Sequence, residues 1–275
     1  MRVLLFVAVL LLSSCGRSAP ESSSWNKPDS IVVGCEDYQS LEIKHGVLYN
    51  NVWNKHADES GDGVQCLESR EVDGSIQYGW SWSWPEGKRV IYAYPQIKVG
   101  SSPWDPEPRF DERFPKRISS LQRFELDFDV ETVTNGDHNL AASVWLTTEP
   151  IKGGEPNPSV IAAEIMIWSY STEGHFDPAG TKTAEIEIDG DWWEVWVDRD
   201  WKDASGMNDN RWTYVTYRSK EQSMSTTLRL LKLLEYAVEH QIVSENLYVS
   251  DLELGNEIMS GSGITWINSF EVVLD

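Results

Sequence analysis

Two glutamates occupy segments in which the neighbouring residues suggest chemistry. Glu164 lies in Ala-Glu-Ile-Met-Ile-Trp, and Glu257 lies in Gly-Asn-Glu-Ile-Met-Ser-Gly-Ser-Gly. Two carboxyl groups that face each other across a sugar-binding cleft are the minimum needed to hydrolyse a glycosidic bond. The chain also contains 14 tryptophans, and indole rings stack well on the apolar faces of sugar rings. These residues predict a glycosidase if the fold brings the two glutamates together.

The residues around Glu164 alternate as they would in a β-strand. Ile165 and Ile167 share one face, and Glu164, Met166 and Trp168 share the other. We expect the isoleucine face to lie between two sheets. The other face places a carboxylate beside a thioether and an indole, which is an unusual combination for a solvent-exposed face. From the pattern alone, however, an exposed strand glutamate without a catalytic role is the simpler interpretation.

Alternation with a period of two residues dominates the chain from about residue 75 onward. Phe124, Leu126 and Phe128 alternate with three acidic residues, which is the pattern of a strand with one solvated face. Asp189-Gly190 is a strong signal for a tight hairpin turn. The same alternation predicts strands at Trp192–Val197, Trp212–Tyr217, Leu247–Leu254 and Phe270–Leu274.

One segment has helical periodicity, and either Ser223 or Ser225 could cap it. Its apolar residues are Met224, Leu228, Leu231 and Leu234, and the opposing charged residues are Arg229, Lys232, Glu235 and Glu239. Many strands and a single helix predict an all-β, concanavalin-like fold. We expect a jelly-roll β-sandwich of two antiparallel sheets with one packed α-helix.

The chain is strongly acidic, with a formal net charge of −21 and a pI near 4.5. Nucleic-acid binding is therefore not expected, because phosphate recognition requires clusters of Lys and Arg. A neutral polymer such as a glucan is compatible with this charge. The length and the absence of repeats favour one large catalytic domain over residues 31–275.

The N-terminal residues are typical of a targeting signal. Arg2 precedes a short apolar run that ends in Leu12-Ser-Ser-Cys15, which resembles the cleavage box of bacterial lipoproteins. We expect a signal peptide at 1–14 and a flexible tether at 15–30, with a lipid anchor on Cys15 that holds the protein at a membrane. Gly16 favours the outer membrane by the same resemblance. An ordinary secretory signal cleaved nearby is the alternative.

Lipidation of Cys15 leaves two cysteines, Cys35 and Cys66. We expect them to form a disulfide, because an exported protein enters an oxidising compartment. Without a Cys-x-x-Cys motif, and with five scattered histidines, the sequence does not predict a zinc site.

Several segments, in order along the chain, resemble glycoside hydrolase family 12, the small endo-β-1,4-glucanases and xyloglucanases. The segment Glu164–Trp168 resembles the nucleophile strand of this family, and Gly255–Gly263 resembles the segment that supplies its acid/base. The resemblance extends from about residue 33 to the C-terminus. The other matching segments are Cys35 and Cys66 around Asn50-Asn-Val-Trp53, Trp82-Ser-Trp84 with Tyr94-Pro95, and Trp212-Thr-Tyr-Val215.

The resemblance implies a retaining mechanism with two glutamates. Glu164 would attack the anomeric carbon, and Glu257 would protonate the leaving oxygen and then activate water. Their carboxyl groups would lie about 5–5.5 Å apart. The charge on Glu164 would raise the pKa of Glu257. The implied substrate-binding residues are Tyr38, Asn51 and Trp53 toward the non-leaving side of the substrate, and Met166 and Trp168 on the floor beside Glu164.

The chain departs from the family pattern near both glutamates. Ser143 stands where family members commonly carry an Asp close to the nucleophile, so the pH optimum is expected to differ. Ile258 and Met259 follow the acid/base in place of Pro-Phe. Thr148-Glu149-Pro imitates the missing Thr-Glu-Pro, but chain order and the trailing Ser-Gly-Ser-Gly favour Glu257 over Glu149.

Other conspicuous residues have simpler interpretations. Glu185, Glu187 and Asp189 alternate strictly, which is typical of the solvated face of a hairpin strand. The stripe formed by Trp80, Trp82 and Trp84 fits either a core or a groove. We expect buried packing for Trp192, Trp193 and Trp196.

We expect a retaining endo-acting enzyme that cleaves β-1,4-glucosidic bonds in cellulose, mixed-linkage glucan or xyloglucan. It would be a monomer in the bacterial cell envelope, either an outer-membrane lipoprotein or secreted, and would need no cofactor or metal. The alternative from another class is a non-catalytic carbohydrate-binding jelly-roll lipoprotein. A jelly-roll hydrolase of another specificity is a third possibility.

Overall fold

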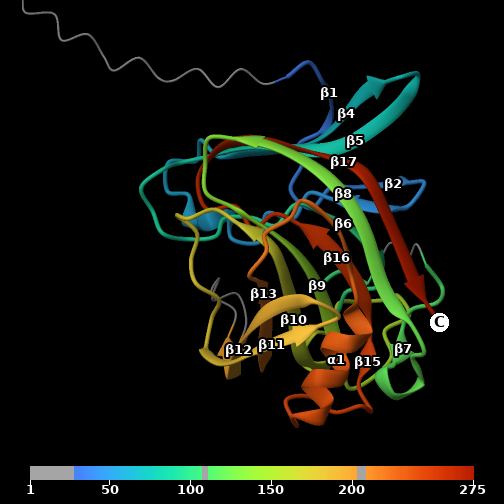
Figure 1. The fold of residues 1–275 in the computed structure, drawn as a ribbon. Coiled ribbons are helices and arrows are strands. Elements are labelled where there is room, and N and C mark those ends of the chain that lie inside the picture. The colour runs from blue at the N-terminus through green and yellow to red at the C-terminus, as the bar shows by residue number, and fades with distance from the viewer. Residues whose placement is uncertain (1–27, 107–110, 203–208) are drawn as a thin grey trace, which may run out of the picture.

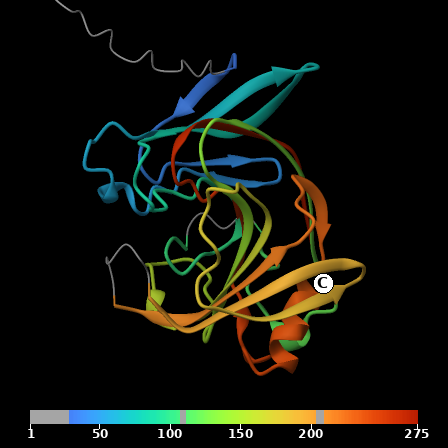
Figure 2. The same ribbon diagram turned by 60° about the vertical axis from the view of Figure 1, so that its left-hand side comes forward.

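The computed structural model describes residues 28–106, 111–202 and 209–275. The expected signal peptide, Cys15 and nearly all of the expected tether lie outside these residues. Two β-sheets dominate the described part and confirm the jelly-roll sandwich, which Figure 1 and Figure 2 show from two sides. No helix in this part is long and apolar enough to cross a membrane.

The smaller sheet has six strands in the order β1-β4-β5-β17-β8-β14. All of its pairings are antiparallel. In sheet order, the strands are β1 (Ile31–Gly34), β4 (Val64–Val72), β5 (Ser75–Trp84), β17 (Gly261–Leu274), β8 (Phe124–Thr134) and β14 (Ser225–Leu228).

The larger sheet has eleven strands, nine of them in the order β11-β12-β13-β10-β9-β16-β6-β3-β2. Neighbouring strands are antiparallel except β10 and β13, which run parallel. The nine are β11 (Thr181–Ile188), β12 (Asp191–Lys202), β13 (Arg211–Ser219), β10 (Ile161–Ser171), β9 (Asn139–Thr147), β16 (Asp251–Gly255), β6 (Gln96–Gly100), β3 (Gly46–Tyr49) and β2 (Ser40–Ile43). The remaining two are β15 (Tyr248–Val249) and β7 (Lys116–Arg117).

Short helical turns connect these strands, namely η1 (Lys55–Ala57), η2 (Ile118–Ser120) and η3 (Pro158–Val160). Between β11 and β12, Asp189 and Gly190 both have positive φ angles, of 54° and 98°. This geometry is that of the tight hairpin turn predicted for the pair, since two-residue turns with positive φ match the twist of the flanking strands.

The main core fills the space between the two sheets. The alternating residues Phe124, Leu126 and Phe128 point into it from β8, as predicted. Trp80, Trp82 and Trp84 point into it from β5 and are at most 3% exposed, so this stripe is core and not groove. These indoles therefore stabilise the sandwich and are not available to stack on a sugar.

The helix α1 (Leu230–Glu239) begins later than predicted. Met224 precedes β14, and Leu228 is the last residue of that strand, where it is buried between the sheets. Neither serine caps the helix, because the N-cap is Arg229 and no side chain bonds there. The spacing of four residues between Met224 and Leu228 fits both a helix and a strand, and residues 225–228 form a strand because they pair with β8. The buried face of the helix consists of Leu230, Leu233, Leu234 and Ala237.

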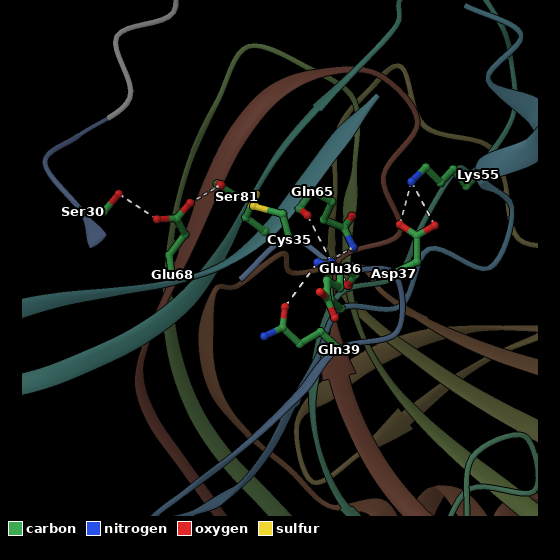
Figure 3. The surroundings of a disulfide bond; sticks show 11 residues. Ser30, Cys35, Glu36, Asp37, Gln39, Lys55, Gln65, Glu68 and Ser81 are labelled. Carbon is green, nitrogen blue, oxygen red and sulfur yellow. Dashed lines mark hydrogen bonds and ion pairs between the residues drawn. A yellow bond between two sulfur atoms is a disulfide. The ribbon is translucent and has the colours of Figure 1, made fainter. Parts of the chain in front are cut away.

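A disulfide joins Cys35, just after the edge strand β1, to Cys66 on β4, as predicted (Figure 3). Beside it, the buried carboxylate of Glu68 accepts hydrogen bonds from the hydroxyls of Ser30 and Ser81. The start of the described chain is thus fastened to the second strand of the small sheet by a covalent bond and by polar contacts.

Candidate active site

The outer face of the large sheet, opposite the main core, carries the candidate site. Ile165 and Ile167 on β10 join the main core, whereas Met166 and Trp168 belong to a second cluster on the outer face. This separation is the one predicted from the alternation around Glu164. Strands β13, β10, β9 and β16 lie side by side under this face (Figure 1).

Glu164 is positioned by two neighbouring strands. Its register partners are Trp145 on β9 and Tyr214 on β13. The indole Nε1 of Trp212 donates a hydrogen bond of 3.1 Å to the Glu164 carboxylate. Glu164 is half-buried, so its carboxyl group is held by the indole and still reachable from the outside.

Glu257 lies just beyond the end of β16 and is held by Asn139, the first residue of β9. The amide nitrogen of the Asn139 side chain donates to the Glu257 carboxylate, and its oxygen accepts the Glu257 backbone N–H at 2.9 Å. The Asn139 backbone N–H donates to the Glu257 carbonyl at 3.1 Å. Three hydrogen bonds to one residue fix this glutamate without the Pro-Phe that follows it in the family pattern.

The pKa of Glu257 is raised to about 7. Burial of the carboxyl group raises it, and the hydrogen bond from Asn139 opposes the rise. The direction agrees with the sequence expectation, but desolvation is the leading cause rather than the charge of Glu164. A glutamic acid with this pKa is protonated in about half of the molecules at neutral pH, whereas an ordinary glutamate is almost fully ionised there.

Two tyrosines lie within electrostatic range of both glutamates. The buried hydroxyls of Tyr94 and Tyr214 have pKa values raised first by desolvation and then by several carboxylates, including Glu164 and Glu257. The Tyr94 hydroxyl donates to the carbonyl of Ala141 at 2.9 Å on β9, between the two glutamates. Both glutamates therefore lie near the same two tyrosines, although 93 residues separate them in the sequence.

An aromatic cluster surrounds Glu164, and most of its members were not predicted. Trp104, Trp145 and Trp212 pack edge to face, with ring centroids 5.6–5.9 Å apart. Trp201 packs on Tyr214 at 5.2 Å. Alternation within Trp212–Tyr217 placed Trp212 and Tyr214 on one face, but only the parallel pairing of β13 with β10 shows that Glu164 shares that face.

A group of buried charged residues on the same face was also missed. Glu253 on β16 lies opposite Ser143 on β9 and Lys98 on β6. Lys98 is 1% exposed and forms an ion pair of 2.7 Å with Asp105. Burial raises the pKa of Glu253 to about 7, and it also raises the pKa of Asp251, whose carboxylate accepts the Trp145 N–H.

Ser143, which stands at the position of the family's Asp, is buried and lies beside Met166 on β10 and Glu253 on β16. β9 thus lacks the family's carboxyl group at this position, but the neighbouring strand β16 supplies a carboxyl group, that of Glu253, opposite Ser143.

Strands β15 and β16 are separated at Ser250, although the sequence predicted one continuous strand. They are separated because the Asp251 carboxylate, and not a backbone carbonyl, accepts the backbone N–H of Trp145.

The other predicted sugar-binding residues lie toward the β3 and β2 side of the sheet. Tyr38 is half exposed and packs near Tyr49 of β3, with ring centroids 6.2 Å apart. The Asn51 amide donates to Gln96 on β6 at 3.4 Å, and Trp53 is half-buried just before η1. Met166 and Trp168 are on the floor beside Glu164, but both are nearly covered, at 3% exposed.

The acidic and tryptophan residues for which the sequence favoured a non-catalytic role lie mostly where that role predicts. Glu149 is exposed in the loop after β9, away from the hydrogen-bonded pair of Asn139 and Glu257. Glu185 and Glu187 are exposed on β11, as predicted, and Asp189 is exposed in the turn. Trp193 is buried, but Trp192 is 44% exposed and Trp196 is half-buried. The prediction of buried packing was therefore wrong for Trp192, because consecutive strand residues point to opposite faces.

Within residues 28–106, 111–202 and 209–275, no three His, Cys, Asp or Glu side chains are grouped so that they could hold a metal ion. The chemistry available on the outer face is that of carboxyl groups and aromatic rings.

Comparison with known proteins agrees with this site. The chain is 28% identical over 264 residues to Endoglucanase S of Pectobacterium parmentieri, covering 96% of this chain and 90% of the relative. It is 24% identical over 237 residues to a probable xyloglucan-specific endo-β-1,4-glucanase A of Aspergillus terreus, covering 86% and 84%. A solved structure of a native family 12 xyloglucanase from Bacillus licheniformis superposes with a TM-score of 0.75 at 25% identity, covering 88% of this chain and 99% of that one.

The model of the Glycosyl hydrolase family 12 matches residues 45–275, which is most of the chain. This match includes strand β10 with Glu164, the segment after β16 with Glu257, the aromatic cluster and the buried charged group. The chain therefore belongs to glycosyl hydrolase family 12 and is a glycoside hydrolase.

Proposed function

We propose that the protein is a retaining endo-β-1,4-glucanase in which Glu164 is the nucleophile and Glu257 is the general acid/base. The observation that carries this assignment is the contrast between the two carboxyl groups. Glu257 is held by Asn139 and has a pKa raised to about 7 by burial, whereas Glu164 is half-buried and accepts a hydrogen bond from the indole of Trp212. A protonated acid beside a carboxylate is the starting state of this mechanism.

In the first step, the Glu164 carboxylate attacks the anomeric carbon while the bond to the leaving oxygen breaks. The proton of Glu257 moves to that oxygen, which leaves as a sugar hydroxyl. In the second step, Glu257 removes a proton from water as the water oxygen attacks the anomeric carbon. The ester to Glu164 breaks, and both glutamates return to their starting protonation states. The sugar keeps its anomeric configuration because it is inverted twice.

The test uses substitutions that keep the shape of each side chain. Glu164→Gln and Glu257→Gln should each lower kcat/KM on a polymeric β-1,4-glucan by about 10³-fold or more, with an unchanged melting temperature. Release of reducing ends measures the rate. Wild-type rates in the Glu164→Gln variant would contradict the assignment.

Azide distinguishes the two roles from each other. With an aryl cellobioside, whose leaving group needs no acid, Glu257→Ala should give a glycosyl azide of retained configuration, because azide opens the covalent intermediate. Glu164→Ala should give an inverted azide, because azide attacks the substrate directly. The opposite result would exchange the two assignments, and NMR of the product reads the configuration.

A non-catalytic carbohydrate-binding protein is not favoured. The chain belongs to a family of hydrolases, and its relatives include an endoglucanase and xyloglucan-specific endo-β-1,4-glucanases. Binding of glucan without release of any reducing end would restore this alternative.

The enzyme acts outside the cytoplasm, as its disulfide indicates, since such bonds persist in oxidising compartments. Beyond this, we propose that the protein is a monomeric, lipid-anchored enzyme of the bacterial outer membrane. The parts are a signal peptide at 1–14, a lipidated Cys15 with a tether to residue 30, and a catalytic domain at 31–275. Metabolic labelling with a palmitate analogue tests the anchor, with Cys15→Ser as the control.

A further inference from the structure

Lys98 is a charged residue buried on the outer face of the large sheet. It lies on β6 opposite Glu253 of β16, and its side chain is 1% exposed. Its ammonium group forms an ion pair of 2.7 Å with Asp105 and lies 4.1 Å from the centroid of the Tyr49 ring. A buried ammonium group needs such partners, because water no longer solvates its charge. The reaction steps proposed above do not involve this ion pair.

Asp105 lies in the segment 101–105, which leaves the sheet after β6. Before Trp104 in this segment, the carbonyl of Pro103 accepts the backbone N–H of Asn157 at 2.9 Å. After Trp104, the carboxylate of Asp105 is held by Lys98. Trp104 is thus the residue between two fastened points, and the ion pair ties the segment back to the strand from which it started.

The ring of Trp104 reaches the surroundings of Glu164. It packs edge to face on Trp145, the register partner of Glu164 on β9, with ring centroids 5.8 Å apart. It packs in the same manner on Trp212 of β13, at 5.9 Å. Strands β16, β9 and β10 separate β6 from β13 in the sheet. Strand pairing therefore does not join Lys98 directly to Trp212, whereas the ring of Trp104 provides a connection.

Trp212 is the residue through which this connection acts on the nucleophile. Its indole Nε1 donates the hydrogen bond of 3.1 Å to the Glu164 carboxylate. The direction of this donor is fixed by the plane of the ring, so a tilt of the ring weakens the bond. The edge-to-face contact with Trp104 limits such a tilt. The contacts run in series from Lys98 through Asp105, Trp104 and Trp212 to Glu164.

A buried ion pair fixes geometry more than it adds stability. The cost of removing two charges from water offsets most of their attraction, whereas a charge-assisted hydrogen bond remains short and directional. Glu253 also lies within electrostatic range of Lys98, so the lysine keeps a counter-charge when Asp105 is lost. Loss of Asp105 is therefore expected to free the segment 101–105 more than to unfold the protein.

We propose that Lys98 and Asp105 are positioning residues for the nucleophile. Their ion pair holds Trp104 against Trp212 and thereby keeps the indole N–H on the Glu164 carboxylate. The proposal rests on the function proposed above and adds two residues to the same site. It requires an effect on kcat, because the orientation of the carboxylate matters when its bond to the anomeric carbon forms.

Three substitutions test the ion pair. Asp105→Ala removes it from the partly exposed side, and Lys98→Met removes it from the buried side with a side chain of similar length. Asp105→Asn keeps the shape and an acceptor oxygen but not the charge. Asp209→Ala is the matched control, because it removes the exposed ion pair of 2.8 Å between Lys202 and Asp209. Each substitution is made in the wild type and in Trp212→Phe, which lacks the indole hydrogen bond.

The rates are measured on mixed-linkage glucan or xyloglucan, whichever the wild type hydrolyses faster. Asp105→Ala and Lys98→Met should each lower kcat about fivefold with less than about twofold change in KM, and Asp105→Asn should lower it about twofold. In Trp212→Phe, the same substitutions should lower kcat by less than a further factor of about two, because the bond that they support is already absent. Asp209→Ala should change kcat in neither background.

Three results would overturn the proposal. A full fivefold loss in both backgrounds would show that the ion pair acts independently of Trp212. A rise in KM at constant kcat would show that the segment 101–105 contacts the substrate instead. Unchanged kinetics would show that the ion pair positions nothing. Melting temperatures establish that each variant folds, and Lys98→Met decides among these results if Asp105→Ala does not fold.

A failure of the proposed function gives a different result. If the wild type releases reducing ends from neither polymer, the endoglucanase assignment itself is wrong, and the positioning role falls with it. If the wild type is active and the losses multiply in the two backgrounds, only the positioning role is wrong.

Discussion

The two faces of the large sheet differ in what they bury. The inner face is aliphatic and aromatic, and residues such as Ile165 and Val195 are at most 1% exposed there, against the small sheet. The outer face also buries aromatic rings, among them Trp145, Trp168 and Trp212, but it holds carboxyl groups and a lysine at low exposure as well. Packing on the inner face therefore stabilises the fold. Burial of ionisable groups on the outer face lowers the stability, because water would solvate these groups better.

The inner face should show the largest effect on folding. Ile165→Ala should lower the free energy of unfolding by about 2–5 kcal/mol, because it removes buried methyl groups and leaves a cavity. Ile165→Val is the control, with an expected loss of about 0.5–1.5 kcal/mol. Urea unfolding measures both. A loss below 1 kcal/mol for the alanine variant would show that the sheets repack around this position.

The outer face should instead show its largest effect on pH dependence. Glu257 must start protonated, so kcat/KM should fall tenfold per pH unit above its pKa of about 7. At pH 9 the rate should be about a hundredfold below its maximum. A profile of kcat/KM from pH 4 to 10 measures this limb. A limb that stays in place in Glu257→Gln, at its lower rate, would assign the ionisation to another group.

The indole beside Glu164 should have an intermediate effect on catalysis and little on folding. Trp212→Phe keeps an aromatic ring in the cluster but removes the hydrogen bond of 3.1 Å to the carboxylate. A hydrogen bond to a charged group contributes about 1.5–3 kcal/mol, so kcat/KM should fall about tenfold or more. Steady-state kinetics and thermal unfolding check this together. A parallel loss of melting temperature would mean that the indole acts through packing.

The smallest effect should come from the buried acid on β16. The pKa of Glu253 is raised to about 7, first by burial, although Lys98 opposes the rise. The folded state therefore binds a proton that the unfolded state releases at lower pH, and stability should fall as the pH rises from about 4.5 to about 7.

Glu253→Gln removes this titration because an amide resembles the protonated acid. The variant should match the wild type near pH 5 and exceed its melting temperature by about 3 °C or more at pH 8. Differential scanning calorimetry at the two pH values gives the comparison. The groups that face Glu253 are Asp251, Gln96, Lys98 and Asp105. An equal shift at both pH values would point to packing instead of ionisation.

The alternation of residues along the sequence was sufficient to predict most strands and the side of β10 on which Glu164 lies. Alternation placed Ile165 and Glu164 on opposite faces, and the disulfide followed from the number of cysteines and their compartment. The same rule failed at Leu228, because its spacing of four residues from Met224 fits one face of a helix and also one face of a strand. It left the Trp80 stripe undecided, because alternation groups side chains without saying which face meets the second sheet.

The remaining parts of the site depend on register between distant strands. Trp212 reaches Glu164 only because β13 runs parallel to β10, and nothing local to either segment indicates that pairing. Glu253 and Ser143 become neighbours through the pairing of β16 with β9, about 110 residues apart in sequence. The position of Glu257 was found through family resemblance, and the asparagine that holds it was not.

The fastening of the first strand has a mechanical consequence. Strand β1 forms the rim of the small sheet and would be the first element to peel away under a pull on the N-terminal end. The bond from Cys35 to Cys66 stops such peeling after four residues and passes the load to β4, which is paired along its whole length with β5. A pull on the N-terminal end would therefore load strands of the small sheet, whereas Glu164 lies on β10 of the other sheet.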